Sequence, residues 1–281
     1  MVLLVSLLAC TPVSPTPAPG PSANYSGSLG PEPDFSLPHS SFQVWIYEAE
    51  SAAVFSGAFA DGPPLRLHTE SAREGNCRIV TYTPTSCSPT CSVGTELCVE
   101  GRCEAYPHRE DHGDIQWTFA GGAATIHPDE TLSYSATESG AEVGETSMEF
   151  EGTTLIAPGT EPLEPMGDWE SALQNRGSGA VTLRWSNPTQ GTRVRLRMTD
   201  CMGTHGGIAA NELECEGPDT GELVLPASML DVMEGGAWDQ GECGGHTFDR
   251  VHIATPEGEP LTRFEFVAGS SVYWFPGRSS M

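Results

Sequence analysis

The sequence contains no lysine. All thirteen basic residues among the 281 are arginine, 38 residues are acidic, and the formal net charge is −25. A surface of this charge repels the phosphate backbone of nucleic acids, so we expect no nucleic-acid partner. It also disfavours a polybasic contact with anionic lipid headgroups. The acidic surplus favours solubility or the attraction of cations.

Long hydrophobic runs and recognised catalytic motifs are also missing. No stretch approaches the eighteen or so apolar residues that a membrane-spanning helix needs. The sequence has no Gly-x-Ser-x-Gly elbow, His-Glu-x-x-His pair, phosphate-binding loop or dinucleotide fingerprint. We therefore expect no cofactor, and no catalytic mechanism is complete in the sequence.

The N-terminal residues 1–9 are apolar and uncharged, and they end immediately before a cysteine. A short apolar segment ending in a small residue predicts a secretory signal peptide. The segment Leu7–Cys10 resembles the lipobox of bacterial lipoproteins, which implies cleavage before Cys10 and lipidation of its sulfur. The resemblance implies a stable membrane anchor without a spanning helix. Thr11 after the cysteine favours the outer membrane, on its periplasmic or its surface-exposed face. The alternative is a chance apolar N-terminus in which Cys10 is an ordinary thiol.

Residues 10–41 read as a linker behind the lipidated cysteine. Eight prolines occur within residues 11–41, with serine, glycine and alanine between them. This composition predicts an extended, disordered tether. The body after it is expected to form two domains, 42–163 and 164–281, because the segment Ala157–Pro165 is rich in proline.

The body shows the alternation of apolar and polar residues that is typical of β-strands. Such alternation places one strand face in the core and the other in water. Arginines at 193, 195 and 197, for example, are expected on the face opposite Val194, Leu196 and Met198. The predicted strands are Phe42–Tyr47, Ile115–Phe119, Met148–Phe150, Val181–Trp185, Val194–Met198, Arg263–Val267 and Ser271–Phe275.

Helical periodicity is weak by comparison. One short helix is expected, Ala227–Met233, with Ser228 as its N-cap. The fold class is therefore mainly β, with two β-sandwich-like units and a cysteine-rich insert at 77–103.

Cysteine usage indicates disulfide bonds. Besides Cys10 the sequence has eight cysteines, an even number that in an exported chain predicts a disulfide framework. Five lie in one cluster and three in another, so full pairing requires at least one bridge between the clusters. The two clusters are Cys77, Cys87, Cys91, Cys98 and Cys103, and Cys201, Cys215 and Cys243.

The spacing from Cys87 to Cys103 resembles small disulfide knots inserted into secreted bacterial proteins. That resemblance implies the pairs Cys87–Cys98 and Cys91–Cys103. Cys201 and Cys215 flank an expected hairpin and are candidates for a third pair, which would leave Cys77 for Cys243. A zinc site made of four thiolates is the competing interpretation of the insert.

Two histidine-containing clusters are candidate sites of chemistry. His108, Asp111 and His112 lie within a short charged stretch that offers ligands for zinc, iron or nickel. A solvated loop is the other interpretation, because Pro107 and Gly113 flank the stretch.

The second cluster comprises His205, His246 and Asp249. Its imidazoles are candidates for base catalysis, with the aspartate orienting one of them. The acidic stretch Glu214–Glu222 is a candidate weak calcium site. Most tryptophans fit inward strand positions, whereas Trp238 among glycines is expected to be exposed.

The layout as a whole resembles surface lipoproteins of Gram-negative bacteria. The shared features are the lipobox, the proline-rich stalk, the β-rich body, the five-cysteine region and the segment Leu225–Leu230. The resemblance implies a lipid-tethered protein with a non-catalytic binding or envelope-structural role and a cell-surface or envelope partner. The alternatives are an exported hydrolase or metal-dependent enzyme that uses the histidine clusters, and a calcium-dependent adhesion module.

Overall fold

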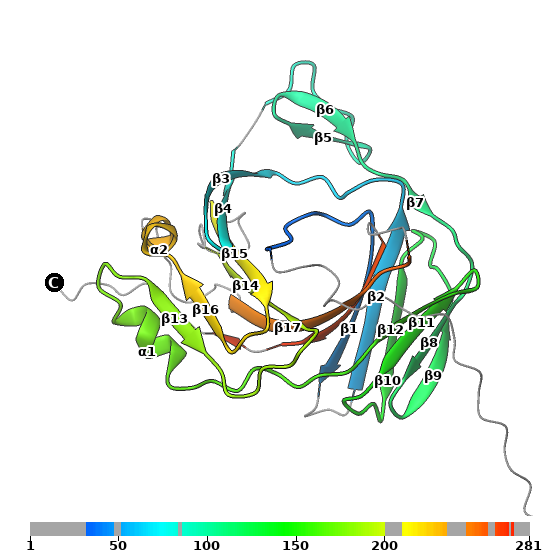
Figure 1. Ribbon diagram of the computed structural model, residues 1–281. Helices are drawn as coiled ribbons and strands as arrows, with labels where there is room; N and C mark the ends of the chain where they lie inside the picture. Colours follow the sequence, from blue (N-terminus) through cyan, green and yellow to red (C-terminus); the bar gives the residue numbers. More distant parts are fainter. Residues whose placement is uncertain are drawn as a thin grey trace, which may run out of the picture.

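A computed structural model describes residues 32–47, 52–83, 86–199, 210–234, 246–257, 262–269 and 271–272. In this part of the chain the protein is mainly β, with several sheets and two short helices (Figure 1). The largest sheet consists of eleven strands, β1 (Ser40–Tyr47), β2 (Ala52–Ala60), β3 (His68–Glu74), β4 (Cys77–Tyr82), β7 (Arg109–Glu110), β10 (Tyr134–Ser139), β14 (Arg193–Thr199), β15 (Asn211–Pro218), β17 (His246–Ala254), β18 (Thr262–Ala268) and β19 (Ser271–Val272).

Smaller elements pack around this large sheet. A four-stranded sheet contains β8 (Ile115–Phe119), β9 (Gly122–Ile126), β11 (Thr146–Phe150) and β12 (Thr153–Ala157). Two antiparallel pairs and the helices complete the described elements: β5 (Glu96–Val99) with β6 (Arg102–Ala105), β13 (Val181–Arg184) with β16 (Glu222–Leu225), α1 (Trp169–Gln174) and α2 (Ala227–Glu234).

The large sheet runs through the whole body. Its order is β10-β2-β1-β18-β17-β14-β15-β4-β3, and the early strand β1 pairs in parallel with the late strand β18. Strands from both sides of the boundary expected at residue 163 therefore belong to one sheet. The domain limits 42–163 and 164–281 stay a prediction.

Two hydrophobic cores lie on the convex side of this sheet. The first lies between β1, β2 and β18 and the four-stranded sheet, and it includes the fully buried Phe42, Phe55 and Trp117. The Trp117 indole Nε1–H donates to Thr146 Oγ1 (2.9 Å), so its polar atom is satisfied inside the core. The second lies between β4, β15, β14 and β17 and the layer formed by β13, β16 and the helices.

The opposite side of the sheet is concave. In Figure 1 the strands from β3 through β4, β15, β14, β17 and β1 to β2 curve around the blue segment that precedes β1. The alternation in β14 is confirmed, because Val194, Leu196 and Met198 join the second core. Arg195 and Arg197 line the concave face.

The structure corrects two local predictions. The predicted tether, residues 10–41, extends too far toward the C-terminus. Strand β1 begins at Ser40, and the residues just before it contact the sheet. Helix α2 begins at Ala227, so Ser228 lies inside its first turn instead of capping it. The Ser228 hydroxyl donates to a Glu74 carboxylate oxygen on β3.

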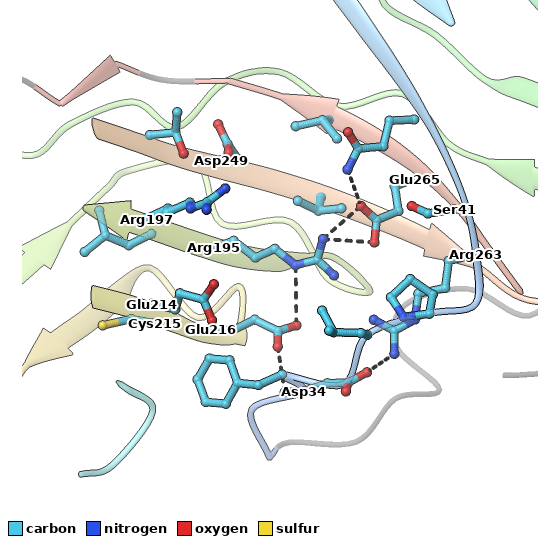
Figure 2. Close-up of a pocket in the computed structure, with 18 of the residues that line it drawn as sticks. Asp34, Ser41, Arg195, Arg197, Glu214, Cys215, Glu216, Asp249, Arg263 and Glu265 are labelled. Carbon is cyan, nitrogen blue, oxygen red and sulfur yellow. Dashed lines mark hydrogen bonds and ion pairs between the residues drawn. The ribbon is translucent and has the colours of Figure 1, made fainter. Parts of the chain in front are cut away.

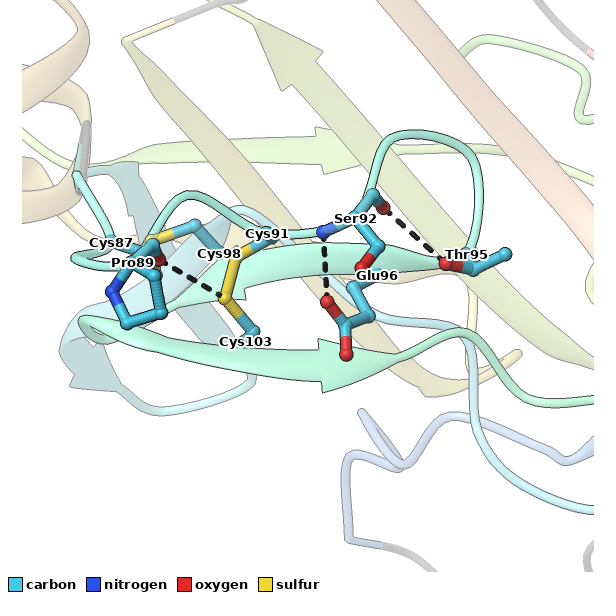
Figure 3. The surroundings of a disulfide bond; sticks show 8 residues. All are labelled: Cys87, Pro89, Cys91, Ser92, Thr95, Glu96, Cys98 and Cys103. Atoms are coloured by element: carbon cyan, nitrogen blue, oxygen red, sulfur yellow. Dashed lines mark hydrogen bonds between the residues drawn. A yellow bond between two sulfur atoms is a disulfide. The ribbon is translucent and has the colours of Figure 1, made fainter.

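The cysteine-rich insert is a hairpin held by two disulfides. Cys87–Cys98 and Cys91–Cys103 are bonded, as the resemblance to small disulfide knots implied (Figure 3). Three of these sulfurs, those of Cys87, Cys91 and Cys103, lie within 4.8 Å of one another. Because each is bonded to another sulfur, metal binding here would first require reduction.

The third disulfide joins Cys77 to Cys215 and differs from the expected pairs. The predictions Cys201–Cys215 and Cys77–Cys243 are therefore wrong. Cys77 on β4 lies directly opposite Cys215 on β15, and this proximity depends on strand order. The requirement for a bridge between the two clusters is confirmed. Cys201 and Cys243 lie outside the described residues.

Candidate binding site on the concave face

The concave face collects arginine and glutamate side chains because neighbouring strands carry them at alternate positions. Strand β14 has arginine at 193, 195 and 197, and β15 has glutamate at 212, 214 and 216. The antiparallel register places Arg195 opposite Glu216 and Arg197 opposite Glu214. Side chains at opposed positions of one sheet face lie close enough to interact. The result is a charged surface whose groups neutralise one another.

Arg195 and Glu265 form the centre of this surface. Arg195 Nη1 donates to both Glu265 carboxylate oxygens (2.9 and 2.8 Å), reaching from β14 across β17 to β18. Gln43 on β1 donates to the same carboxylate (3.0 Å). Figure 2 shows Arg195 and Glu265 facing each other. Burial opposes the charge of Arg195, but Glu265 and Glu216 outweigh it and raise the pKa of the guanidinium.

A second ion pair, Arg193–Glu216, is almost fully buried. Arg193 Nε donates to Glu216 Oε1 (2.5 Å), and the two side chains are 1% and 2% exposed. Burial raises the pKa of Glu216 above its usual value, although Arg195 and Arg193 act against it. A buried pair of this kind is costly to break, because the remaining charge would have no partner.

Glu214 anchors the side of the face near β4. It accepts from Arg78 Nε (2.7 Å) and from Arg66 Nη1 (3.1 Å). Burial raises the pKa of Glu214, but these arginines more than offset it and the pKa is lowered overall. Arg197 pairs with Glu212 on the rim of the same surface (2.7 Å).

A cavity of about 620 Å³ opens onto this surface. Its wall includes Trp45, Thr247 and Asp249 besides the charged groups, so it offers an aromatic ring, a hydroxyl and a buried carboxylate. Arg263 also lines it, and its side chain is only 4% exposed. The Arg263 Nε–H is buried and has no hydrogen-bond partner among the described residues.

The segment Glu32–Pro38, called the strap from here on, occupies part of the concave face. Its main chain is held at two points: the Asp34 N–H donates to Glu216 (2.6 Å), and the Glu32 carbonyl accepts from Arg193 (2.7 Å). Both partners belong to the buried ion pair on β14 and β15. The strap therefore rests on groups that the sheet has already fixed in place.

Side chains of the strap are held as well. The Asp34 carboxylate accepts hydrogen bonds from Arg263 and from the Ser36 hydroxyl. The Ser36 hydroxyl oxygen in turn accepts a hydrogen bond from Arg263 (2.7 Å). Burial raises the pKa of Asp34, but the bonds from Ser36 and Arg263 more than offset it and lower the pKa overall. The Phe35 ring lies 4.5 Å from the Arg78 guanidinium carbon and 5.1 Å from that of Arg73, within the range of cation–π contacts.

The predicted metal cluster is dispersed in the structure. His108 Nδ1 lies 3.1 Å from Asp61, and Asp111 accepts the Gly113 N–H within its own loop. His112 lies against the Phe59 ring, and its Nδ1 is 3.1 Å from a Glu151 oxygen. Within the described ranges, the one group of three potential ligand residues close enough for a metal is the cysteine set named above.

The predicted histidine–aspartate cluster is described in part. His246 and Asp249 both border the cavity, but they are three residues apart on β17, so their side chains leave the strand on opposite sides. His246 Nδ1 lies 3.3 Å from the Thr199 amide nitrogen. His205, Trp238 and Cys10 lie outside the described residues.

The acidic stretch Glu214–Glu222 is not a loop. Its first residues belong to β15 and its last begins β16. Glu214 and Glu216 are engaged with arginines, as described above, and Asp219 is bonded to Arg250 (2.7 Å). These carboxylates hold the sheets together, which corrects the expectation of a calcium loop at this position.

Sequence reasoning missed the strap, Arg263 and Glu265 as parts of one site. The alternating arginines of β14 were a usable signal, since they predicted a charged face. Arg263 and Glu265 on β18 become neighbours of the strap before β1 only because β1 and β18 pair in parallel.

Comparisons with known proteins do not assign this chain to a family. Neither a scan against protein-family models nor a search of curated proteins gives a match for this chain. In the described part of the chain, no helix has the length and apolar composition needed to cross a membrane.

Proposed function

We propose that this chain is an exported, lipid-tethered binding protein whose ligand surface is the concave face of the large sheet. The observation that carries the proposal is that the charged groups there are fixed by one another and already hold an extended peptide, the strap. Preorganised groups of this kind suit recognition, because little entropy is lost when a ligand binds. The proposal includes no catalytic step.

Three disulfides support an exported location. Disulfides persist in oxidising compartments and are rare in the cytosol. With Cys10 carrying lipid, the anchor would lie in the outer membrane, and residues 11–31 would form the tether. The partner would then be a component of the cell envelope or of the surface.

Lipid attachment at Cys10 is tested by metabolic labelling with an alkyne fatty acid. We expect the wild-type protein to be labelled and to sediment with outer membranes, and Cys10→Ser to be unlabelled and released. Thr11→Asp is the matched control: it keeps the cysteine and should remain labelled but move to the inner-membrane fraction. Equal labelling of wild type and Cys10→Ser would refute the anchor.

We also propose that the body consists of two β-sandwich-like units that share the large sheet. The two hydrophobic cores support this division, since the first is covered by the four-stranded sheet and the second by β13, β16 and the helices. A protease site inserted between residues 158 and 162 tests it. Because β1 pairs with β18, the two fragments should stay associated on gel filtration after cleavage and reduction of the Cys77–Cys215 disulfide, and separation would contradict a shared sheet.

The enzyme and adhesion alternatives have their own measurements. Stoichiometric zinc in the purified protein would favour a metal-dependent enzyme, and a calcium-dependent rise in melting temperature would favour an adhesion module. The ion-paired state of Glu214 and Asp219 favours the binding role over a calcium site in this region.

A further inference from the structure

The strap is bound in the way that proteins bind separate peptides. Its main chain donates one hydrogen bond to the sheet and accepts one from it, and two adjacent side chains, Asp34 and Phe35, each have their own partners. Arg263 donates to the Asp34 carboxylate. The guanidinium groups of Arg78 and Arg73 contact the Phe35 ring. The surface therefore recognises a carboxylate followed directly by an aromatic ring.

The strap leaves part of the surface uncovered. The cavity of about 620 Å³ lies beside it, with strap residues forming one wall. Arg197 and Asp249 border the cavity, and the buried Arg263 Nε–H has no acceptor among the described residues. A longer or differently shaped segment would thus gain contacts that the strap does not make.

We propose that the concave face is a peptide-binding site for an extended segment of a partner protein that carries an acidic residue followed by an aromatic one, and that the strap occupies this site until the partner displaces it. The inference rests on the binding role proposed above but not on lipid attachment. The partner must compete with a segment of the same chain, whose effective concentration is in the millimolar range. The uncovered cavity supplies the additional contacts that such competition requires.

The test uses the full chain with the strap weakened and a synthetic peptide added. The Asp34→Asn/Phe35→Ala variant removes both side-chain anchors without changing the sheet. The probe is a fluorescent peptide with the sequence of residues 32–38, Glu-Pro-Asp-Phe-Ser-Leu-Pro, followed by fluorescence anisotropy. We expect the variant to bind the peptide at least about 50-fold more tightly than the wild type, in which the intact strap competes.

Matched controls separate recognition from general charge attraction. A peptide with Asn and Ala at the Asp and Phe positions should bind the variant at least about tenfold more weakly. Adding Arg73→Gln to the variant should weaken peptide binding several-fold, since its guanidinium contacts Phe35. Adding Arg184→Gln should leave binding unchanged, because this arginine pairs with Glu222 on β16 and does not line the cavity.

A second measurement covers the case in which the strap variant does not fold. In the wild-type chain, millimolar peptide should accelerate hydrogen exchange at the Asp34 amide, which Glu216 protects. The doubly substituted peptide should not do so.

Three results would overturn the proposal. They are no peptide binding by a folded strap variant, equal binding of both peptides, and a concentration-dependent dimer of the wild type formed by exchanged straps. The last result would make a second copy of the chain the occupant. Failure of Cys10 labelling would leave all these measurements unaffected, so the anchoring and peptide-binding proposals fail separately.

Discussion

Cys77 and Cys215 face each other on the adjacent strands β4 and β15, and their sulfur atoms are bonded. The bond links positions 138 residues apart in the sequence. It also belongs to the second hydrophobic core, where both residues are almost completely buried. The early and late parts of the chain are therefore joined covalently inside the core as well as through strand pairing.

Removing this disulfide should lower stability strongly. We expect Cys77→Ala/Cys215→Ala to reduce the free energy of unfolding by roughly 4–5 kcal/mol, because the unfolded chain regains the entropy of a long loop. Guanidinium denaturation measures the loss. Cys87→Ala/Cys98→Ala, which opens a separation of 11 residues, is the control and should cost no more than about 3 kcal/mol. An equal loss in the two variants would contradict the loop argument.

The ion pair between Arg250 and Asp219 should contribute strongly to the stability of the folded protein. Asp219 accepts from Arg250 Nε (2.7 Å) and from the Trp185 indole Nε1–H (2.6 Å), and both charged side chains are at most 1% exposed. Asp219→Ala should cost about 3–5 kcal/mol of unfolding free energy, because it leaves the buried guanidinium uncompensated. Thermal and denaturant unfolding followed by circular dichroism provide the measurement.

The exposed pair Arg184–Glu222 is the control for that substitution. Its side chains are 55% and 53% exposed, so Glu222→Gln should change stability by less than about 1 kcal/mol. Comparable losses in Asp219→Ala and Glu222→Gln would show that burial of the ion pair does not matter.

His252 should make the protein less stable in mild acid. Burial and the nearby Arg250 lower its pKa to about 4, although Asp219 partly opposes the shift. Between pH 6.5 and 4 the unfolded chain binds a proton that the folded protein does not, so stability is present above this window and is lost as the pH falls through it. The loss is at most about 3 kcal/mol.

His252→Gln isolates this effect from other titrations. The variant should show a smaller decrease in unfolding free energy between pH 6.5 and 4 than the wild type, measured by urea denaturation at several pH values. Parallel pH profiles for the two proteins would rule out His252 as the source. Carboxylates with lowered pKa values, such as Asp34 and Glu214, lose their contribution at lower pH in both proteins and cancel in the comparison.

Gly57 permits the close approach of β1 and β2 in the first core. A methyl group at this position would overlap the Phe42 ring and the Ser41 carbonyl oxygen. Gly57→Ala should therefore cost about 1–3 kcal/mol through overpacking, detected as a lower melting temperature. Gly62→Ala, whose added carbon would meet only Pro107 at 3.4 Å, should be nearly neutral. A neutral Gly57→Ala would mean that β1 and β2 are more loosely packed than described.

The candidate site was predictable only in part. The alternating arginines at 193, 195 and 197 predicted one charged strand face, and the structure bears this out for Arg195 and Arg197 at the cavity. The residues before β1 were expected to be a disordered tether because of their prolines. They are held on the sheet because Arg193, Glu216 and Arg263 supply hydrogen bonds that composition does not reveal.

The sequence by itself determined the mainly β class of fold and the faces of individual strands, because an extended backbone repeats every two residues. The two short-range disulfides of the insert were implied by its resemblance to small disulfide knots. Only the tertiary structure decided that Cys77 bonds Cys215, that Arg195 reaches Glu265 and that the strap lies on the concave face. Such contacts depend on the order of strands in the large sheet, which joins β1 to β18 across more than two hundred residues.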